Sequence, residues 1–278
     1  MASARDSYIA TFDAVEAQRG RLGLSEPGGG RWDASAARFT ADPRREPDAN
    51  LATVLDFIRP EHVVMDVGGG AGRYALPIAL RCKEMINVEP SKGMGEAFQA
   101  SAREAGITNA RWLASEWLEA GEVIGDVSLV VNVTYFVSDA VPFIEKLVQA
   151  SRDRVIIATS ITPPPNQSTR AFELVHGEPQ AAVPGYRELL LVLWEMGIVP
   201  DVRVLYEARA SALADTHRDR DAALASLDDP RRTGAESSRL TALFVAHFDE
   251  LFEAVAGGYR RRVSGDPRMI LVTWSTRR

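Results

Sequence analysis

The chain has 278 residues, enough for one large α/β domain with additions or for two small domains. Its hydrophobic fraction of 46% and charged fraction of 25% are ordinary for a globular protein, and a net charge of -6 argues against binding nucleic acid through phosphate contacts. The single cysteine, Cys82, excludes an internal disulfide and a cysteine metal cluster, and no apolar run is long enough for a membrane span or a signal peptide, so we expect a cytoplasmic protein with no membrane partner.

Residues 1–58 are expected to form an N-terminal helical extension. Apolar side chains recur at helical spacing in 7–18 and in 50–58, and 32–39 indicates another short helix between them. The glycine-rich stretch 21–30 is typical of a flexible joint. Two interpretations stay open, a mobile lid over a ligand and simple packing on the outside of a sheet.

A buried strand, a glycine-rich turn and a helix follow one another in residues 62–80, and the chain is organised around them. Asp66 lies at the carboxyl end of the apolar strand, and four of the next six residues are glycines: Gly68, Gly69, Gly70 and Gly72. In doubly wound folds this unit binds a nucleotide outside the end of the first strand. The dinucleotide pattern G-x-G-x-x-G fails because Arg73 occupies the third glycine position, and no P-loop Gly-Lys-Ser/Thr follows.

A second short strand, 85–88, ends in Glu89. This glutamate comes about 20 residues after the turn, the distance at which nucleotide-binding folds place an acidic ribose ligand. A carboxylate suits that role because it accepts a hydrogen bond from each hydroxyl of a vicinal diol.

The pattern Asp66-x-Gly68-x-Gly70-x-Gly72 resembles motif I of the class I S-adenosylmethionine-dependent methyltransferases, and the resemblance extends over about residues 51–159. It implies S-adenosylmethionine as the cofactor, approached by the backbone at Gly68 and Gly70. The Asp66 carboxylate would attract the cationic amino end of the methionine moiety. Glu89 would bind the ribose hydroxyls.

A third strand, 110–114, is followed by Ser115, Glu116 and Trp117. In the family that motif I resembles, a polar or acidic residue at this point bonds the adenine amino group and an apolar neighbour packs on the ring. The resemblance therefore implies Ser115 or Glu116 as the polar contact and Trp117 as the packing residue. The usual aspartate is absent, and Trp117 as a core aromatic stays open.

A fourth strand, 126–131, ends at Asn132, and the loop that follows resembles motif IV of the same family. This loop would stand between cofactor and acceptor. We expect Asn132 to bond the methionine end of the cofactor or the acceptor, and Tyr135 to be the catalytic residue that orients the acceptor or takes its proton. The alternative for Tyr135 is packing under a cap.

Three more predicted strands, 154–159, 202–206 and 269–274, complete the alternation of strands and helices. The alternation predicts an α/β fold: a doubly wound, Rossmann-like and mostly parallel sheet of about seven strands with helices on both faces. We assign residues 59–278 to this methyltransferase domain.

Two insertions, at about 166–197 and 209–265, have helical spacing and are expected to form a helical cap over the carboxyl edge of the sheet. Together with the N-terminal helices they would enclose the acceptor. Arg260, Arg261 and Arg262 form a small basic patch, which we interpret as a solvated turn.

The sequence thus predicts an enzyme that transfers a methyl group from S-adenosylmethionine to a small-molecule acceptor by in-line displacement. Such a reaction depends on alignment more than on acid–base side chains. Two alternatives stay open, a nicotinamide-dependent oxidoreductase and a regulatory protein that binds the cofactor without catalysis. The four histidines have no metal-binding spacing, so no metal is expected. The acceptor, the atom methylated and the oligomeric state are left open.

Overall fold

The computed structural model describes residues 2–24, 32–33, 36–205, 216–227 and 234–277. Its centre is a seven-stranded sheet in the order β3-β2-β1-β4-β5-β10-β6. The strands are β1 (Val63–Val67), β2 (Glu84–Val88), β3 (Ala110–Leu113), β4 (Gly125–Val131), β5 (Ser151–Ser160), β6 (Asp201–Leu205) and β10 (Met269–Ser275). β10 runs antiparallel to both of its neighbours, β5 and β6, and the other strand pairs are parallel, so the predicted mostly parallel α/β fold is confirmed.

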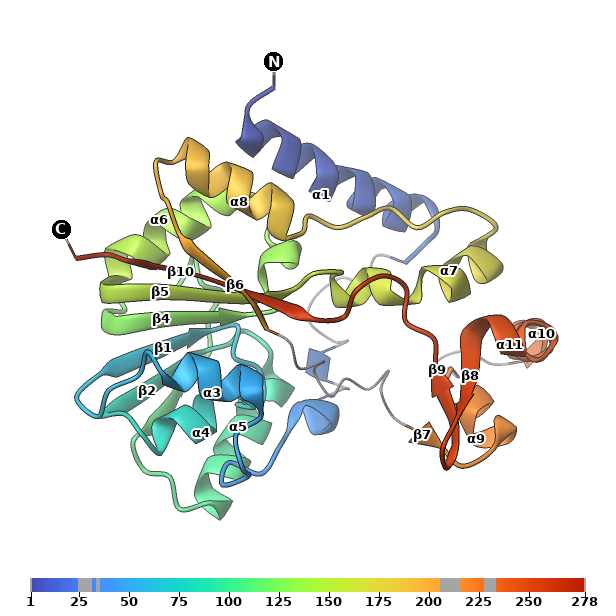
Figure 1. Cartoon of the computed structure of the whole chain (residues 1–278), viewed down its shortest axis with the longest axis horizontal. Coiled ribbons are helices and arrows are strands. Elements are labelled where there is room, and N and C mark those ends of the chain that lie inside the picture. The colour runs from blue at the N-terminus through green and yellow to red at the C-terminus, as the bar shows by residue number, and fades with distance from the viewer. Residues whose placement is uncertain (1, 25–31, 34–35, 206–215, 228–233, 278) are drawn as a thin grey trace.

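Helices cover both faces of the sheet (Figure 1). One layer holds α3 (Ala49–Leu55), α4 (Ala75–Ala79) and α5 (Lys92–Glu104), and the other holds α1 (Ala4–Arg21), α6 (Ala140–Ala150) and α8 (Tyr186–Glu195). Strand side chains alternate between the two cores: Val64 packs with the α3–α5 layer, whereas Met65 and Val67 pack with the other. Because both faces are covered at the centre of the sheet, the central strands β1, β4 and β10 are apolar nearly throughout, whereas the edge strand β6 is exposed along most of its length.

The helices predicted at 7–18 and 50–58 are α1 and α3, and the described residues between them are less regular. α1 begins at a Ser3 cap that accepts from Asp6 N, and its Tyr8 hydroxyl donates to Thr134 O at 2.5 Å. Of the predicted helix at 32–39, Trp32 and Asp33 are helical, residues 34–35 lie outside the described residues, and the rest is the short 3₁₀ helix η1 (Ala36–Phe39). Much of the expected joint, 25–31, lies outside the described residues.

The two insertions separate in space. In the first, η3 (Pro164–Ser168) and α7 (Thr169–His176) continue past the end of β5, whereas α8 packs beside α1 and α6 on the face of the sheet. The second lies beyond the end of β5, on the side of the sheet where the parallel strands end (Figure 1). We call the second insertion the cap; its described part is residues 216–227 and 234–265.

The sequence indicated a helical cap, but the described part of the cap contains strands as well as helices. It holds the helices α9 (Arg220–Ala225), α10 (Gly234–Ala246) and α11 (Phe248–Leu251), and a three-stranded antiparallel sheet of β7 (Thr216–His217), β9 (Gly258–Arg261) and β8 (Phe252–Val255). The helical spacing of aromatics continues to Phe252, but the chain becomes extended there because Gly257 and Gly258, both at positive φ, turn it back into a hairpin. The ring of Phe252 still stacks on Phe248, with centroids 4.9 Å apart.

Candidate functional site

The glycine turn after β1 depends on backbone angles that side chains disfavour. Gly68, Gly70 and Gly72 have φ of 70°, 55° and 86°. A Cβ on Gly68 would lie 2.6 Å from Val133 Cγ2, and one on Gly72 would lie 2.6 Å from a ring carbon of Phe98. Gly70 differs, because the nearest atom to its Cβ position is 3.7 Å away. The turn is therefore closed on the protein side at Gly68 and Gly72 and open at Gly70, where a ligand can approach the backbone.

Two polar side chains lie beneath this turn. A Cβ on Gly69 would be 2.5 Å from both Asp66 Oδ2 and Asn87 Oδ1, and Asn87 Nδ2 donates to Gly70 O at 2.9 Å. Burial raises the pKa of Asp66 to about 7, and the nearby Glu89 charge adds to the shift. Asp66 Oδ1 is buried with no hydrogen-bond partner among the described residues. A cation brought to this carboxyl would favour its ionised form.

Glu89 is held at the end of β2 by the backbone of the turn. Gly70 N donates to Oε2 at 3.0 Å and Ser91 N donates to Oε1 at 2.9 Å. Burial is the largest cause that raises the pKa of Glu89, and these two hydrogen bonds act against it. A carboxylate has about four acceptor positions, so each oxygen keeps room for one more donor. The side chain is thus fixed in place and can still accept two hydrogen bonds.

Residues ahead of the first strand reach this point, which the sequence did not assign. Asp33 accepts from Ser91 Oγ at 2.6 Å and from Gly93 N at 2.8 Å, and these bonds lower the pKa of Asp33. The rings of Trp32 and Phe136 pack edge to face, with their centroids 5.5 Å apart. Residues 32–33 therefore contact both the start of α5 and the loop after β4. The only sequence signal for them was a short helical pattern.

The loop after β4 contains the other predicted residues. Asn132 has φ of 58° and its Oδ1 accepts from Ser160 N at 3.1 Å and Oγ at 3.2 Å. Its Nδ2 is buried without a partner among the described residues, so both of its N–H donors remain for a ligand. Tyr135 lies in η2 (Thr134–Phe136), is 2% exposed, and packs edge-on to Phe136 with centroids 4.8 Å apart.

The residues after β3 are divided by the fold. Glu116 is exposed, yet its charge contributes to raising the pKa of Glu89, and Ser115 precedes it at the strand end. Trp117 is 4% exposed and lies in the core, where its Nε1 donates to Phe143 O at 3.3 Å and Lys146 Nζ lies 4.9 Å from the ring centroid. This position favours the alternative that Trp117 is a core aromatic, and Trp117 is not among the residues that we propose to contact the cofactor.

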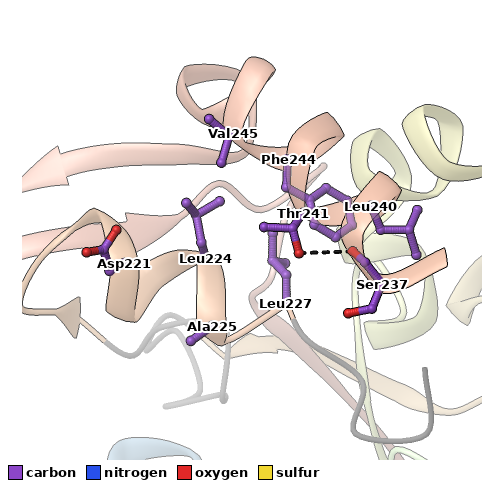
Figure 2. A pocket seen from close by; sticks show the side chains of 9 residues that line it. All are labelled: Asp221, Leu224, Ala225, Leu227, Ser237, Leu240, Thr241, Phe244 and Val245. Carbon is purple, nitrogen blue, oxygen red and sulfur yellow. Dashed lines mark hydrogen bonds between the residues drawn. The ribbon is translucent and has the colours of Figure 1, made fainter. Parts of the chain in front are cut away.

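A cavity of about 330 Å³ lies between α9 and α10, and Figure 2 shows apolar side chains such as Leu224 and Phe244 around it. All its lining residues belong to the cap, so it is separate from the glycine turn. Within the ranges that the structure describes, no group of three or more His, Cys, Asp or Glu side chains is placed to hold a metal ion. No helix in the same ranges has the length and apolar character to cross a membrane, and the cytoplasmic location stays a prediction.

No protein-family model matches the chain. An uncharacterised protein from Haemophilus influenzae is 24% identical over 171 residues, 60% of this chain and 63% of that protein. The uncharacterised methyltransferase YcgJ from Bacillus subtilis is 41% identical over 65 residues, 23% of this chain and 26% of YcgJ. The chain therefore spans less than two thirds of the length of either curated relative.

Solved structures match over much more of the chain. The crystal structure of YcgJ has a TM-score of 0.53 at 14% identity and covers 82% of this chain and 98% of YcgJ. A putative methyltransferase from Bacillus halodurans has a TM-score of 0.54 at 11% identity and covers 83% of this chain and all of that one. Geranyl diphosphate C-methyltransferase from Streptomyces coelicolor has a TM-score of 0.50 at 15% identity and covers 92% and 87%. The fold of this chain is that of the class I S-adenosylmethionine-dependent methyltransferases, as its glycine motif predicted.

Proposed function

We propose that the chain is an enzyme that transfers a methyl group from S-adenosylmethionine to a small-molecule acceptor. One observation carries the proposal: the Glu89 carboxylate is fixed by Gly70 N and Ser91 N at the open side of the glycine turn, with acceptor positions left for a diol. The sheet order supports a ligand site at this turn, because such folds bind ligands at the carboxyl ends of the strands where the strand order reverses, here between β1 and β4.

The polar atoms around the turn fit the groups of this cofactor. Glu89 would accept from the two ribose hydroxyls, while Gly68 and Gly70 let the backbone approach. Asp66, a carboxyl with a partnerless oxygen beneath the turn, would interact with the cationic amino end. The partnerless Nδ2 of Asn132 would donate to the methionine carboxylate or to the acceptor. These are hydrogen bonds that the described residues leave unmade, and unmade buried bonds are costly.

The adenine would lie beyond the ribose, near the residues that follow β3. Ser115 and Glu116 remain our candidates for its amino group, because Glu116 is close enough to Glu89 to affect its pKa. Trp112 adds rigidity here, since its Nε1 donates to Glu89 O at 2.7 Å.

The acceptor would lie on the side of η2, the N-terminal residues and the cap. Tyr8 fixes η2 from α1, and Trp32 covers Phe136, so two parts of the N-terminal extension touch the loop that carries Tyr135. Phe136 is 41% exposed, which leaves an aromatic surface beside Tyr135. We assign residues 1–58 to an extension that closes this side of the methyltransferase domain, 59–278.

The cofactor, when bound, supplies an activated methyl group on a sulfonium. The protein's part is to hold the acceptor in line and to exclude water, which supplies more rate than a general base alone. Tyr135 is the residue that we place against the acceptor. Its exposure of 2% holds the ring in one position, which an orienting residue needs, but packing under the cap would give the same burial, so the Tyr135→Phe variant decides between the two.

Isothermal titration calorimetry with S-adenosylhomocysteine and with NADH tests the proposal. We expect saturable binding of the first and none of the second. Tight NADH binding without S-adenosylhomocysteine binding would overturn the proposal in favour of an oxidoreductase. Mass spectrometry of the small molecules in the reaction mixture, after incubation with S-adenosylmethionine and candidate acceptors, distinguishes an enzyme from a protein that only binds the cofactor.

A further inference from the structure

The three consecutive arginines, Arg260, Arg261 and Arg262, do not form the solvated turn that the sequence indicated. Arg260 and Arg261 end strand β9, and Arg262 N continues its pairing by donating to Leu251 O at 2.8 Å. In the β8–β9 register Arg260 faces Glu253, and Arg261 faces Phe252. Paired residues share a face of a sheet, so Arg260 and Arg261 point to opposite faces.

The surroundings of the three guanidinium groups differ sharply. Arg260 donates to Glu253 Oε1 through Nε at 3.0 Å and Nη2 at 2.7 Å. Arg262 Nε donates to the carbonyl oxygens of Asp249 and Phe252. Arg261 is partly buried on the face that holds Phe252, which is 1% exposed, and burial lowers the pKa of Arg261. Across the described ranges, no residue forms an ion pair or a hydrogen bond with the Arg261 side chain.

A cavity of about 60 Å³ lies beside Arg261, between β9 and the start of α7. Its polar lining includes Arg170, Arg262, Ser168 and Ser264. Ser264 Oγ accepts from Thr169 Oγ1 at 2.7 Å, which leaves its own proton for another acceptor.

One carboxylate also lines the cavity, and it is already neutralised. Glu250 is bound by Arg170, with Nη2 and Oε2 2.6 Å apart, and by His247 Nδ1 at 2.7 Å from Oε1. Arg170 is paired with Glu250 and also with Glu173 at 3.1 Å, and Arg262 lies 3.9 Å from Glu253, so Arg261 is the one lining arginine without a partner among the described residues.

We propose that this cavity binds a carboxylate or phosphate group of the methyl acceptor, with the Arg261 guanidinium as its main contact; the inference rests on the proposed function. A partly buried cation without a partner is unfavourable, and an anion in the cavity removes that penalty. Arginine suits the task because its planar fork donates two parallel hydrogen bonds to the oxygens of a carboxylate or phosphate.

The position of the cavity connects it with the acceptor side of the site. The segment that follows Arg262 leads to β10, and on the way Asp266 N donates to Thr162 Oγ1 at 2.9 Å. Thr162 comes two residues after Ser160, the residue that binds Asn132. An acceptor with its reacting atom near Tyr135 and its anionic group near Arg261 would thus span the space between the end of β5 and the cap.

The first experiment uses inorganic phosphate as the probe and the full chain as the protein. Thermal unfolding and calorimetry at low ionic strength compare wild type, Arg261→Gln and the matched control Arg260→Gln, which removes a neighbouring arginine from the opposite face. We expect phosphate to bind and stabilise wild type and Arg260→Gln, and to bind Arg261→Gln about tenfold more weakly or worse. Without phosphate, Arg261→Gln should be at least as stable as wild type, because it removes a partly buried charge that has no partner among the described residues. Equal phosphate binding by Arg261→Gln, or an equal loss in Arg260→Gln, would overturn the site.

A second experiment distinguishes the acceptor from a free anion. Candidate acceptors are supplied as pairs, an acid and its neutral amide, and release of S-adenosylhomocysteine is measured. Wild type should prefer the acid, and Arg261→Gln should lose that preference by a rise in KM. If phosphate binds at Arg261 while acids and amides react equally, the anion is separate from the acceptor and that part is wrong. Binding of S-adenosylhomocysteine should be the same in all three proteins; its absence from all of them would instead refute the proposed function.

Discussion

Replacing Glu89 with alanine is the sharpest test of the cofactor site. The Glu89 carboxylate accepts from Gly70 N and Ser91 N and, in our proposal, from both ribose hydroxyls. Glu89→Ala removes all four acceptor positions at once. The loss of hydrogen bonds to a charged group at a site that is 8% exposed should weaken cofactor binding by about 1–3 kcal/mol, or roughly 5- to 150-fold in Kd.

Calorimetry with S-adenosylhomocysteine measures this change, and Glu96→Ala is the matched control. Glu96 lies on the exposed side of α5, where its nearest charged partner is Lys92 at 3.7 Å. Its removal should leave Kd unchanged, because exposed ion pairs contribute little. Thermal unfolding verifies that both variants fold. A folded Glu89→Ala protein with the wild-type Kd would refute the assignment of the ribose to Glu89.

Three further changes probe the same region. Gly70→Ala should weaken S-adenosylhomocysteine binding at least tenfold, with a small loss of stability of about 1 kcal/mol for the positive φ. Gly68→Ala should destabilise the fold more, because its Cβ would meet Val133. Calorimetry measures the binding and thermal unfolding measures the stability of both variants. The pKa of Asp66 is about 7 in the folded state and near 3.8 in the unfolded state, so the stability that the protonated Asp66 contributes is complete below pH 4 and is lost as the pH rises through 7. Urea titrations at a series of pH values should therefore show the free energy of unfolding of wild type fall by at most about 4 kcal/mol over this range, and Asp66→Asn should lack this fall. Tyr135→Phe should lower kcat about tenfold with unchanged S-adenosylhomocysteine affinity, and a loss well over 100-fold would identify a general base instead.

The central fold and the glycine turn could be predicted because their signals are local. Each strand is a short apolar run, and the turn needs glycine at positive φ within five residues. Glu89 was assigned by its distance from that turn. The structure adds that Gly70 N and Ser91 N hold it, a contact that the sequence pattern does not contain.

Features that depend on tertiary packing were not predictable in this way. The apolar character of Trp117 suits a ligand site as well as a core, and that of α8 suits a cap as well as a core. Their packing in the core beside α6, which the sequence does not show, decides both cases. The β8–β9 hairpin was not predicted, because Phe248 and Phe252 are four residues apart and this spacing indicates a helix. The helical pattern of 32–39 did not reveal the contact of Asp33, since its partner Ser91 is 58 residues away in sequence.

The cap has its own hydrophobic core, and this separates its role from that of the cofactor site. Its buried side chains, including Leu240, Phe244 and Phe248, form a cluster distinct from the two cores that line the sheet. The chain also leaves and re-enters the sheet at neighbouring points, since Leu205 of β6 pairs with Met269 of β10. An antiparallel pair of this kind can be closed by a two-residue turn.

Replacing residues 206–268 with Asn-Gly should therefore leave a folded domain that keeps the glycine turn and the residues around Glu89. We expect its Kd for S-adenosylhomocysteine to stay within about threefold of wild type, a change below 1 kcal/mol. Methyl transfer to the acceptor that wild type uses should be abolished, because the cap would no longer enclose the acceptor. Loss of cofactor binding in a folded variant would place part of that site in the cap, and retained turnover would place the acceptor elsewhere. Either result would contradict our proposal that the sheet binds the cofactor and the cap selects the molecule that is methylated.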